Sequence, residues 1–200
     1  PHYNRRVAEC RIGVRLLAQA FPGITHLRDV GDRPWEDLEP LLPEAISREE
    51  LLRRGIDPAH ILDSGVDPQT DTFFVRRRSR HVITENRRVL DACAALEAGD
   101  VVRLGALMNA AHASARDDYE ISTPEIEALV EAARALPGAV AARLTGAGWG
   151  GCIVALVAQG EAAAFAPALV TAYRAATGHQ AQVFVCRSAA GAGLVLQTTV

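Results

Sequence analysis

The chain contains the stretch Arg143-Leu144-Thr145-Gly146-Ala147-Gly148-Trp149-Gly150-Gly151-Cys152, followed by the apolar run Ile153-Val154-Ala155-Leu156-Val157. Four glycines fall within six positions, between two short runs with the alternating or β-branched character of strands. We therefore expect a hairpin whose connecting loop carries little side chain. Such a loop can adopt positive φ and lets another group approach its bare backbone.

Two interpretations of this glycine loop stay open from its residues alone. Successive unencumbered N–H groups can form a concave nest for an anion such as phosphate. Glycines also occur in hairpin loops for turn geometry alone. The loop is not a Walker phosphate loop, because no Lys-Ser or Lys-Thr pair follows it. It does not read well as a dinucleotide-binding fingerprint, because a strand rather than a helix follows it.

Outward from the hairpin, apolar residues recur mainly at helical spacings of three and four. With their capping and stop signals, these patterns predict long helices from Asn4 to Gln19, from Val75 to Gly99, from Asp100 through Ala115, from Ser122 to Pro137 and from Glu161 to Thr177. Short-range signals predict N-caps at Ser47, Asp57 and Asp67. Further strands are expected at Leu27–Val30 and Gln182–Cys186, with a possible one at Leu194–Gln197.

This order of elements predicts an α+β fold, with helices laid on one face of an antiparallel sheet. The most regular helix keeps a four-three seam, which we expect to face the core and which comprises Val75, Ser79, Val82, Asn86, Val89, Cys93 and Leu96.

Composition places the chain among ordinary globular proteins, with 200 residues, 49% hydrophobic and 22% charged residues. No apolar run reaches membrane-spanning length, and the net charge of -3 gives no general attraction to nucleic acid. All 21 basic residues are arginine, so no lysine of this chain binds phosphate. The four cysteines are widely spaced in apolar patterns, which predicts buried thiols in a reducing, cytoplasmic setting. Because the chain opens with Pro1, we expect it to be processed or part of something longer.

Four blocks of the sequence together resemble, in the same order, the GHMP small-molecule kinases, and more narrowly their galactose-phosphorylating members. The glycine loop is the last block, and the earlier three are Tyr3-Asn4-Arg5-Arg6-Val7-Ala8-Glu9-Cys10, Arg80-His81-Val82-Ile83-Thr84-Glu85-Asn86 and His112-Ala113-Ser114-Ala115-Arg116-Asp117-Asp118-Tyr119-Glu120-Ile121-Ser122. The resemblance implies that residues 1–200 form one GHMP-kinase C-terminal domain with an α/β-plait-like sheet. The serine-rich phosphate cradle, Mg²⁺ ligands and catalytic Asp of that family belong to an N-terminal domain, and their motifs do not occur here.

The implied reaction transfers the γ-phosphate of ATP, with Mg²⁺, to the C1 hydroxyl of α-D-galactose. The resemblance places Tyr3 at the sugar, where a phenol can donate and accept hydrogen bonds beside an apolar edge. It places no catalytic residue in this chain. It sets a loop beneath the ATP-phosphate segment, formed by Gly146, Ala147, Gly148, Trp149, Gly150 and Gly151. Alternatively, Tyr3 simply packs on the surface.

Two residues depart from the family pattern. The family usually has Gly at the position of Ala147 and Phe at that of Trp149. A methyl group is tolerable at residue 147 only with negative φ, and Trp needs more room than Phe. Neither change removes the backbone amides.

Several other polar residues invite functional readings that we do not favour. His81 and His112 fit helix interfaces better than a catalytic base. The triplet Arg116-Asp117-Asp118 fits capping and ion pairs, and the run Arg76-Arg77-Arg78-Arg80 fits a solvated helix face rather than a nucleic-acid patch.

Two rival functions remain open at this point. One is a kinase of the same superfamily acting on N-acetylgalactosamine, arabinose or mevalonate. The other is a sensor that binds sugar and ATP and signals through a partner without catalysis. Neither a nucleic acid nor a membrane is expected as a partner.

Overall fold

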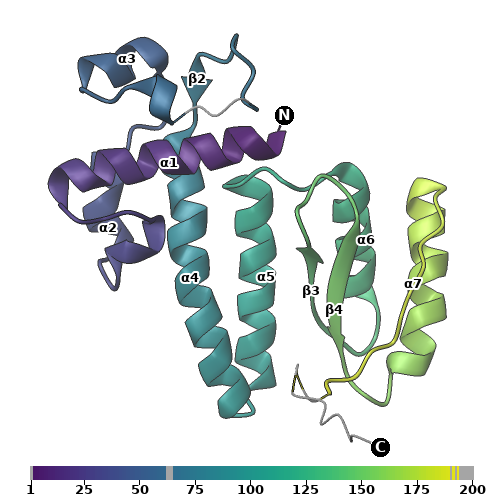
Figure 1. Ribbon diagram of the computed structural model, residues 1–200. Coiled ribbons are helices and arrows are strands. Elements are labelled where there is room, and N and C mark those ends of the chain that lie inside the picture. Colours follow the sequence, from purple (N-terminus) through teal and green to yellow (C-terminus); the bar gives the residue numbers. More distant parts are fainter. Residues whose placement is uncertain (1, 62–64, 190, 192, 194–200) are drawn as a thin grey trace, which may run out of the picture.

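The computed structural model describes residues 2–61, 65–189, 191 and 193, and three long helices form its central framework (Figure 1). Helix α4 (Val75–Glu97) and helix α5 (Val101–Asp117) lie side by side as an antiparallel pair, and α1 (His2–Ala20) crosses the end where α4 begins. The hairpin of β3 (Ala139–Thr145) and β4 (Cys152–Val157) lies on the far side of α5. Helices α6 (Pro124–Ala135) and α7 (Ala162–Thr177) complete that end of the molecule.

The helices begin and end where the sequence signals predict. The Asp100 carboxylate accepts the Arg103 N–H at the start of α5, and the Thr123 hydroxyl accepts the Ile126 N–H at the start of α6. Gly178, with φ of 74°, ends α7 in the left-handed conformation. These caps satisfy terminal backbone groups locally, so the helix boundaries are readable from short stretches of sequence.

The β3–β4 hairpin is antiparallel, with Leu144 opposite Ile153 and Thr145 opposite Cys152. One face packs against α6 and α7, in a cluster that includes Ala142, Leu144, Val130, Phe165 and Leu169. The predicted α+β class and the strands on both sides of the glycine loop are therefore confirmed. The glycine loop projects from the end of the hairpin that lies near the start of α1 (Figure 1).

A second apolar cluster lies under α1 and is closed by short elements between α1 and α4. These are η1 (Leu27–Val30), α2 (Trp35–Leu38), η2 (Glu39–Leu41), β1 (Ile46–Ser47), α3 (Arg48–Arg53), η3 (Pro58–His60) and β2 (Thr72–Phe73). Strand β1 pairs antiparallel with β2, with Ile46 opposite Phe73. The cluster includes Ile12, Leu17, Leu38, Leu51 and Phe73, all fully enclosed. None of the helices in the described part of the chain is long and apolar enough to cross a membrane.

Some predicted strands and turns are different in the structure. Leu27–Val30 is a 3₁₀ turn, because the Asp29 carboxylate accepts the N–H groups of Thr25 and His26 and folds the chain locally. Residues 182–186 form no strand, since their backbone has no ladder partner among the described residues. Asp67 caps a turn through the Gln69 N–H instead of a helix. Residues Leu194–Gln197 lie outside the described part.

The predicted seam of α4 faces the core only in its first half. Val75 and Ser79 are buried, but Val89 and Leu96 are more than half exposed. Figure 1 shows α1 crossing the beginning of α4 and α5 running alongside its second half, while η1 and α2 also pack against α4. The prediction of four buried thiols is also wrong, because Cys93, Cys152 and Cys186 are exposed and Cys10 is half-buried; all four are free.

Candidate functional site

The start of α1 and the glycine loop lie against each other. The imidazole of His2 stacks on the indole of Trp149, with ring centroids 6.0 Å apart and planes inclined by 27°. Tyr3 follows directly in the first turn of α1, and its side chain is 62% exposed. His2 and Trp149 are 147 positions apart, so the start of α1 and the glycine loop are distant in sequence but neighbours in space.

The loop backbone is mostly left-handed. Positive φ angles occur at four of its positions that are glycines, namely Gly146 (87°), Gly148 (87°), Gly150 (123°) and Gly151 (92°). Trp149 shares this conformation with φ of 57°, which costs a residue with a Cβ roughly 1–3 kcal/mol. Ala147 is not among the residues with positive φ, so its methyl group is accommodated. Both departures from the family pattern are therefore compatible with the backbone that this loop adopts.

The centre of the loop is fastened to the segment that precedes α6. The Trp149 N–H donates to the Ile121 carbonyl at 2.7 Å. A Cβ added at Gly148 would lie 2.5 Å from Ile121 Cβ and 2.6 Å from the Ile121 carbonyl oxygen. At Gly146, Gly150 and Gly151, an added Cβ would meet no atom of the described residues within 4 Å. The loop is therefore packed at its centre, while its flanking backbone is accessible to an approaching group such as an anion.

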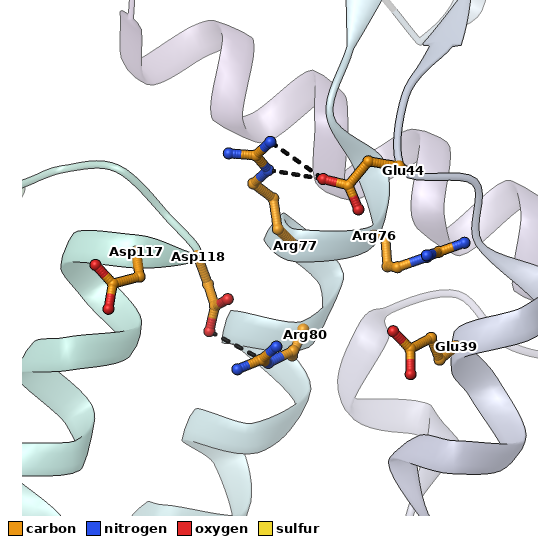
Figure 2. Close-up of a pocket in the computed structure, with 7 residues that line it drawn as sticks. All are labelled: Glu39, Glu44, Arg76, Arg77, Arg80, Asp117 and Asp118. Carbon is orange, nitrogen blue, oxygen red and sulfur yellow. Dashed lines mark hydrogen bonds and ion pairs between the residues drawn. The ribbon is translucent and has the colours of Figure 1, made fainter.

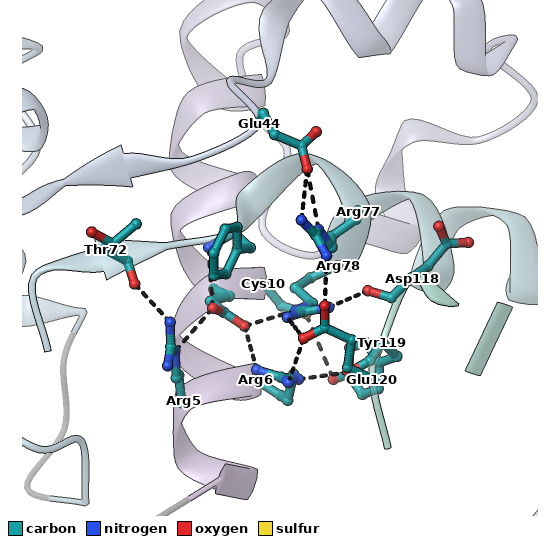
Figure 3. Close-up of polar contacts among 12 residues, drawn as sticks. Arg5, Arg6, Cys10, Glu44, Thr72, Arg77, Arg78, Asp118, Tyr119 and Glu120 are labelled. Atoms are coloured by element: carbon teal, nitrogen blue, oxygen red, sulfur yellow. Dashed lines mark hydrogen bonds and ion pairs between the residues drawn. The ribbon is translucent and has the colours of Figure 1, made fainter. Parts of the chain in front are cut away.

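A buried ionic network holds α1, α4 and the turn before Ile121 together (Figure 3). Its centre is Glu9, which is fully buried and whose two oxygens accept four hydrogen bonds. Oε1 accepts from Arg5 Nε and the Phe74 N–H, and Oε2 accepts from Arg6 and Arg78 at 3.0 Å each. Using all four acceptor sites compensates for removing this carboxylate from water.

Glu120 forms the second acidic centre of the network. Its Oε2 accepts from Arg78 at 2.6 Å and from Arg6 at 3.3 Å, and its Oε1 accepts from Arg77 at 2.5 Å. Arg6 and Arg78 also donate to the carbonyls of Tyr119 and Asp118. Burial raises the pKa of the Glu120 carboxyl, but the hydrogen bond from Arg78 and the three guanidinium charges outweigh it and leave the pKa below its ordinary value.

His81 belongs to a neighbouring cluster on α4 and α5. Its ring stacks on Tyr119 with centroids 4.5 Å apart, and its Nδ1 lies 3.0 Å from the Ser114 hydroxyl, which donates to Asp118. Burial lowers the pKa of His81 and raises that of the Cys10 thiol, which contacts the Tyr119 hydroxyl, to about 11. These contacts pack α4 against the 117–120 turn, as expected for an interface histidine.

His112 and Asn109 protect the free edge of β3. The Leu144 N–H donates to His112 Nδ1 at 3.2 Å, and the Ala142 N–H donates to Asn109 Oδ1 at 3.4 Å. The neutral tautomer of His112 therefore carries its proton on Nε2. That atom lies 3.1 Å from Glu127 Oε1, without the alignment of a good hydrogen bond. Burial lowers the pKa of His112, so the neutral form that accepts from Leu144 is favoured.

A polar cavity of about 210 Å³ lies between α4, the end of α5 and the segment around Glu44 (Figure 2). Its lining side chains are Glu39, Glu44, Arg76, Arg77, Arg80, Asp117 and Asp118. Arg77 pairs with Glu44 at 3.1 Å, and Arg80 lies 3.5 Å from Asp118. Four carboxylates against three guanidinium groups do not make a site for an anion. Among the described residues, no group of three or more His, Cys, Asp or Glu could hold a metal ion.

Sequence reasoning missed the ionic network. The arginine run on α4 was interpreted as a solvated face, but Arg78 is fully buried and pairs with Glu9 and Glu120. One signal was present: arginines occur in the otherwise apolar faces of both α1 and α4, together with acidic residues at Glu9 and Glu120. The triplet at residues 116–118 forms ion pairs, including one of 2.7 Å between Arg116 and Asp117.

Comparison with known proteins finds similar sequences in one family. Residues 92–175 match the family described as GHMP kinases C terminal. The chain is 42% identical over 194 residues to the galactokinase of Roseiflexus sp. (strain RS-1), covering 97% of this chain and 42% of that protein. It is 39% identical over 193 residues to the galactokinase of Chloroflexus aurantiacus (strain ATCC 29366 / DSM 635 / J-10-fl), covering 96% of this chain and again 42% of that protein.

A solved structure agrees with these sequence matches. The crystal structure of Lactococcus lactis galactokinase complexed with galactose superposes with a TM-score of 0.68 at 30% identity, over 90% of this chain and 39% of that one. The chain is therefore similar to GHMP kinases in their C-terminal part, and its fold matches that of a galactokinase. It is similar to galactokinases along nearly its whole length, and it spans less than half the length of those relatives.

Proposed function

We propose that this chain is the C-terminal part of a cytoplasmic galactokinase, which transfers the γ-phosphate of ATP to the C1 hydroxyl of α-D-galactose. The proposal draws support from the galactokinase matches over 97% and 96% of the chain. The nucleotide cradle, the Mg²⁺ ligands and the catalytic base are assigned to an N-terminal domain. By itself the chain is then inactive.

The observation that carries this proposal is the contact of His2 with Trp149. It brings Tyr3, the proposed sugar ligand, beside the loop proposed to support the phosphates. A phosphoryl-transfer site needs its acceptor and donor substrates adjacent, because positioning supplies much of the catalysis. An exposed tyrosine beside a loop with an accessible backbone suits that arrangement.

In this proposal the chain positions groups and excludes water. The Tyr3 hydroxyl hydrogen-bonds a sugar hydroxyl, and the open backbone at Gly146, Gly150 and Gly151 lies beneath the phosphate-binding segment of the other domain. When bound, MgATP supplies the phosphoryl group and the metal charge that neutralises the developing negative charge. The open glycine flanks leave room for such a neighbour, since an added Cβ there meets no atom of the residues that the structure describes.

The test uses the full-length protein and this chain in parallel, in a coupled assay of ADP release. We expect the full-length protein to have its highest kcat/KM with galactose, ahead of N-acetylgalactosamine, arabinose and mevalonate. We expect this chain to show no galactose-dependent turnover above background. A preference for another acceptor, or turnover by the chain alone, would contradict the proposal.

The sensor alternative is separated by a binding measurement on the same full-length protein. Calorimetry that detects both galactose and ATP, in a protein without turnover on any acceptor, would favour a sensor over an enzyme.

A further inference from the structure

We propose that Glu120 is a positioning residue that fixes the glycine loop relative to the first turn of α1. The effect on catalysis rests on the proposed function, whereas the effect on the loop does not.

The first step is how tightly Glu120 itself is held. Its carboxylate contacts three guanidinium groups from two helices, Arg6 of α1 and Arg77 and Arg78 of α4. Its backbone has φ of 53°, a left-handed conformation that a residue with a Cβ adopts only when its surroundings enforce it. The three charge-assisted contacts can enforce this conformation, because each is stronger than a hydrogen bond between neutral groups.

The second step is transmission to the loop through a single residue. Ile121 follows Glu120, and its N–H donates to the Ala115 carbonyl at 3.1 Å. The Ile121 carbonyl accepts the Trp149 N–H, and its side chain fills the space above Gly148. A rotation at Glu120 therefore moves both the hydrogen bond and the packing that locate the centre of the loop.

The third step is the link to Tyr3. Arg6 lies three residues after Tyr3, on the adjacent turn of α1. Its guanidinium bridges Glu9, the Tyr119 carbonyl at 2.6 Å and Glu120. The first turn of α1 and the glycine loop thus share one anchor, and Figure 3 shows these side chains converging on Glu120.

Glu120 differs from Glu9 in a way that makes this role testable. The Glu9 side chain is fully buried, whereas that of Glu120 is 41% exposed. Removing the Glu9 charge would leave the buried Arg6 and Arg78 with Glu120 as their shared acidic partner and would threaten folding. At Glu120, water can reach the arginines after the carboxylate is removed, so the chain should stay folded while its turn loosens.

The experiment follows the fluorescence of Trp149 in this chain. Its two tryptophans are Trp35 and Trp149, so Trp35→Phe leaves the loop residue as the sole indole. In that background we compare Glu120→Gln, which keeps the shape, with Glu120→Asn, which tolerates left-handed backbone but is too short to reach the arginines. Glu44→Gln is the matched control, since Glu44 pairs with Arg77 but does not adjoin Ile121. Leu51→Ala, in the distant apolar cluster, controls for lost stability.

We expect both Glu120 variants to raise acrylamide quenching of Trp149 by about twofold, as local opening does without global unfolding. The two controls should leave quenching unchanged, with circular dichroism confirming that all variants are folded. Quenching that stays at the wild-type value in folded Glu120 variants would overturn the proposal. If both Glu120 variants fail to fold, Arg77→Gln, which releases only one carboxylate oxygen, must raise quenching, and an unchanged value there also overturns it.

Kinetics of the full-length protein separate this inference from the proposed function. Glu120→Gln should lower kcat for galactose about tenfold, equivalent to about 1.4 kcal/mol of misplacement, while Glu44→Gln leaves it unchanged. Increased Trp149 quenching with full activity would leave Glu120 as the anchor of the loop and remove the loop from the active site.

Discussion

Gly148 in the glycine loop and Gly13 in α1 both lie where no Cβ fits, yet different obstacles exclude it. Above Gly148 the obstacle is the backbone and Cβ of Ile121, and the residue has φ of 87°. Above Gly13 the obstacle is the Ser79 hydroxyl on α4, in an ordinary helical conformation. Of these two glycines, only Gly148 is required both by a positive φ and by a main-chain neighbour that leaves no room for a Cβ.

The two obstacles differ in whether a second substitution can remove them: a side chain can be replaced, whereas the main chain cannot. Ser79 Oγ is buried without a hydrogen-bond partner in the described part of the chain, so the obstacle at Gly13 is a group that the fold does not use. The obstacle at Gly148 is part of the main chain and also accepts the Trp149 N–H. We infer that the helix crossing tolerates redesign, whereas the loop does not.

The largest effect is expected for Gly148→Val. It combines a strained positive φ with overpacking against Ile121, which together cost roughly 2–6 kcal/mol. Urea denaturation followed by circular dichroism measures the loss. The matched variant Gly150→Ala has a strained φ but open space, and should lose only about 1–3 kcal/mol. Equal losses in the two variants would mean that Ile121 does not confine the loop.

The Gly150→Ala variant also tests whether the loop has a role in the active site. If the proposed function holds, Gly150→Ala in the full-length protein should lower kcat or ATP affinity in the folded fraction, because its Cβ would occupy the open space assigned to the phosphate-binding segment. Full specific activity of the folded Gly150→Ala protein would leave the loop as a hairpin turn.

At the helix crossing, Gly13→Ala should cost about 1–3 kcal/mol by overpacking against Ser79. Ser79→Ala alone should be neutral or stabilising, because it removes a buried hydroxyl without a partner. The double variant should recover wild-type stability or exceed it, since an added Cβ at Gly13 lies 3.5 Å from Ser79 Cβ and alanine favours helix. Thermal melts of the four proteins form a double-mutant cycle. Additive losses would contradict the steric origin of the contact.

The parts of the fold that sequence predicts are those decided locally. The caps at Asp100 and Thr123, the stop at Gly178 and the two strands beside the loop each depend on residues within a few positions. The failures arise where tertiary partners decide. The run at residues 182–186 has strand composition but no ladder partner among the described residues. The outer half of α4 has a helical period, but its seam residues Val89 and Leu96 are more than half exposed.

For the candidate site, sequence singled out Tyr3 and the loop but not what brings them together. The burial of Arg78 depends on Glu9, 69 positions earlier, and on Glu120, 42 positions later. No local pattern reports such pairing, so an arginine-rich helix resembles a solvated face until its partners are placed. The positive φ of Trp149 is likewise imposed by the hydrogen bond to Ile121.

A pH effect smaller than these losses is expected at the free edge of β3. The pKa of His112 is lowered in the folded chain, so its neutral form is favoured and folding is weakened by protonation. Its contribution is fully present above the ordinary pKa of 6.5 and is lost as pH falls below that value. His112→Gln keeps an acceptor for the Leu144 N–H without titrating. Urea midpoints between pH 7.5 and 5 should fall less steeply for this variant, with His81 titrating in both proteins; parallel curves would contradict the assignment.

The smallest effect is expected for Tyr3. This residue lies on α1, which carries Gly13 at its crossing with α4 and His2 at its contact with the glycine loop. If the loop end of α1 belongs to the sugar site, Tyr3→Phe in the full-length protein should raise KM for galactose and leave KM for ATP nearly unchanged. One neutral hydrogen bond is worth about 0.5–1.5 kcal/mol, which corresponds to an increase of roughly two- to tenfold. Stability should not change, because the side chain is mostly exposed. Tyr173→Phe, on α7 away from the loop, removes the same hydroxyl elsewhere and should leave both KM values unaltered. Unchanged galactose kinetics in Tyr3→Phe would place this tyrosine on the surface, and the contact of His2 with Trp149 would then be a packing contact like that at Gly13.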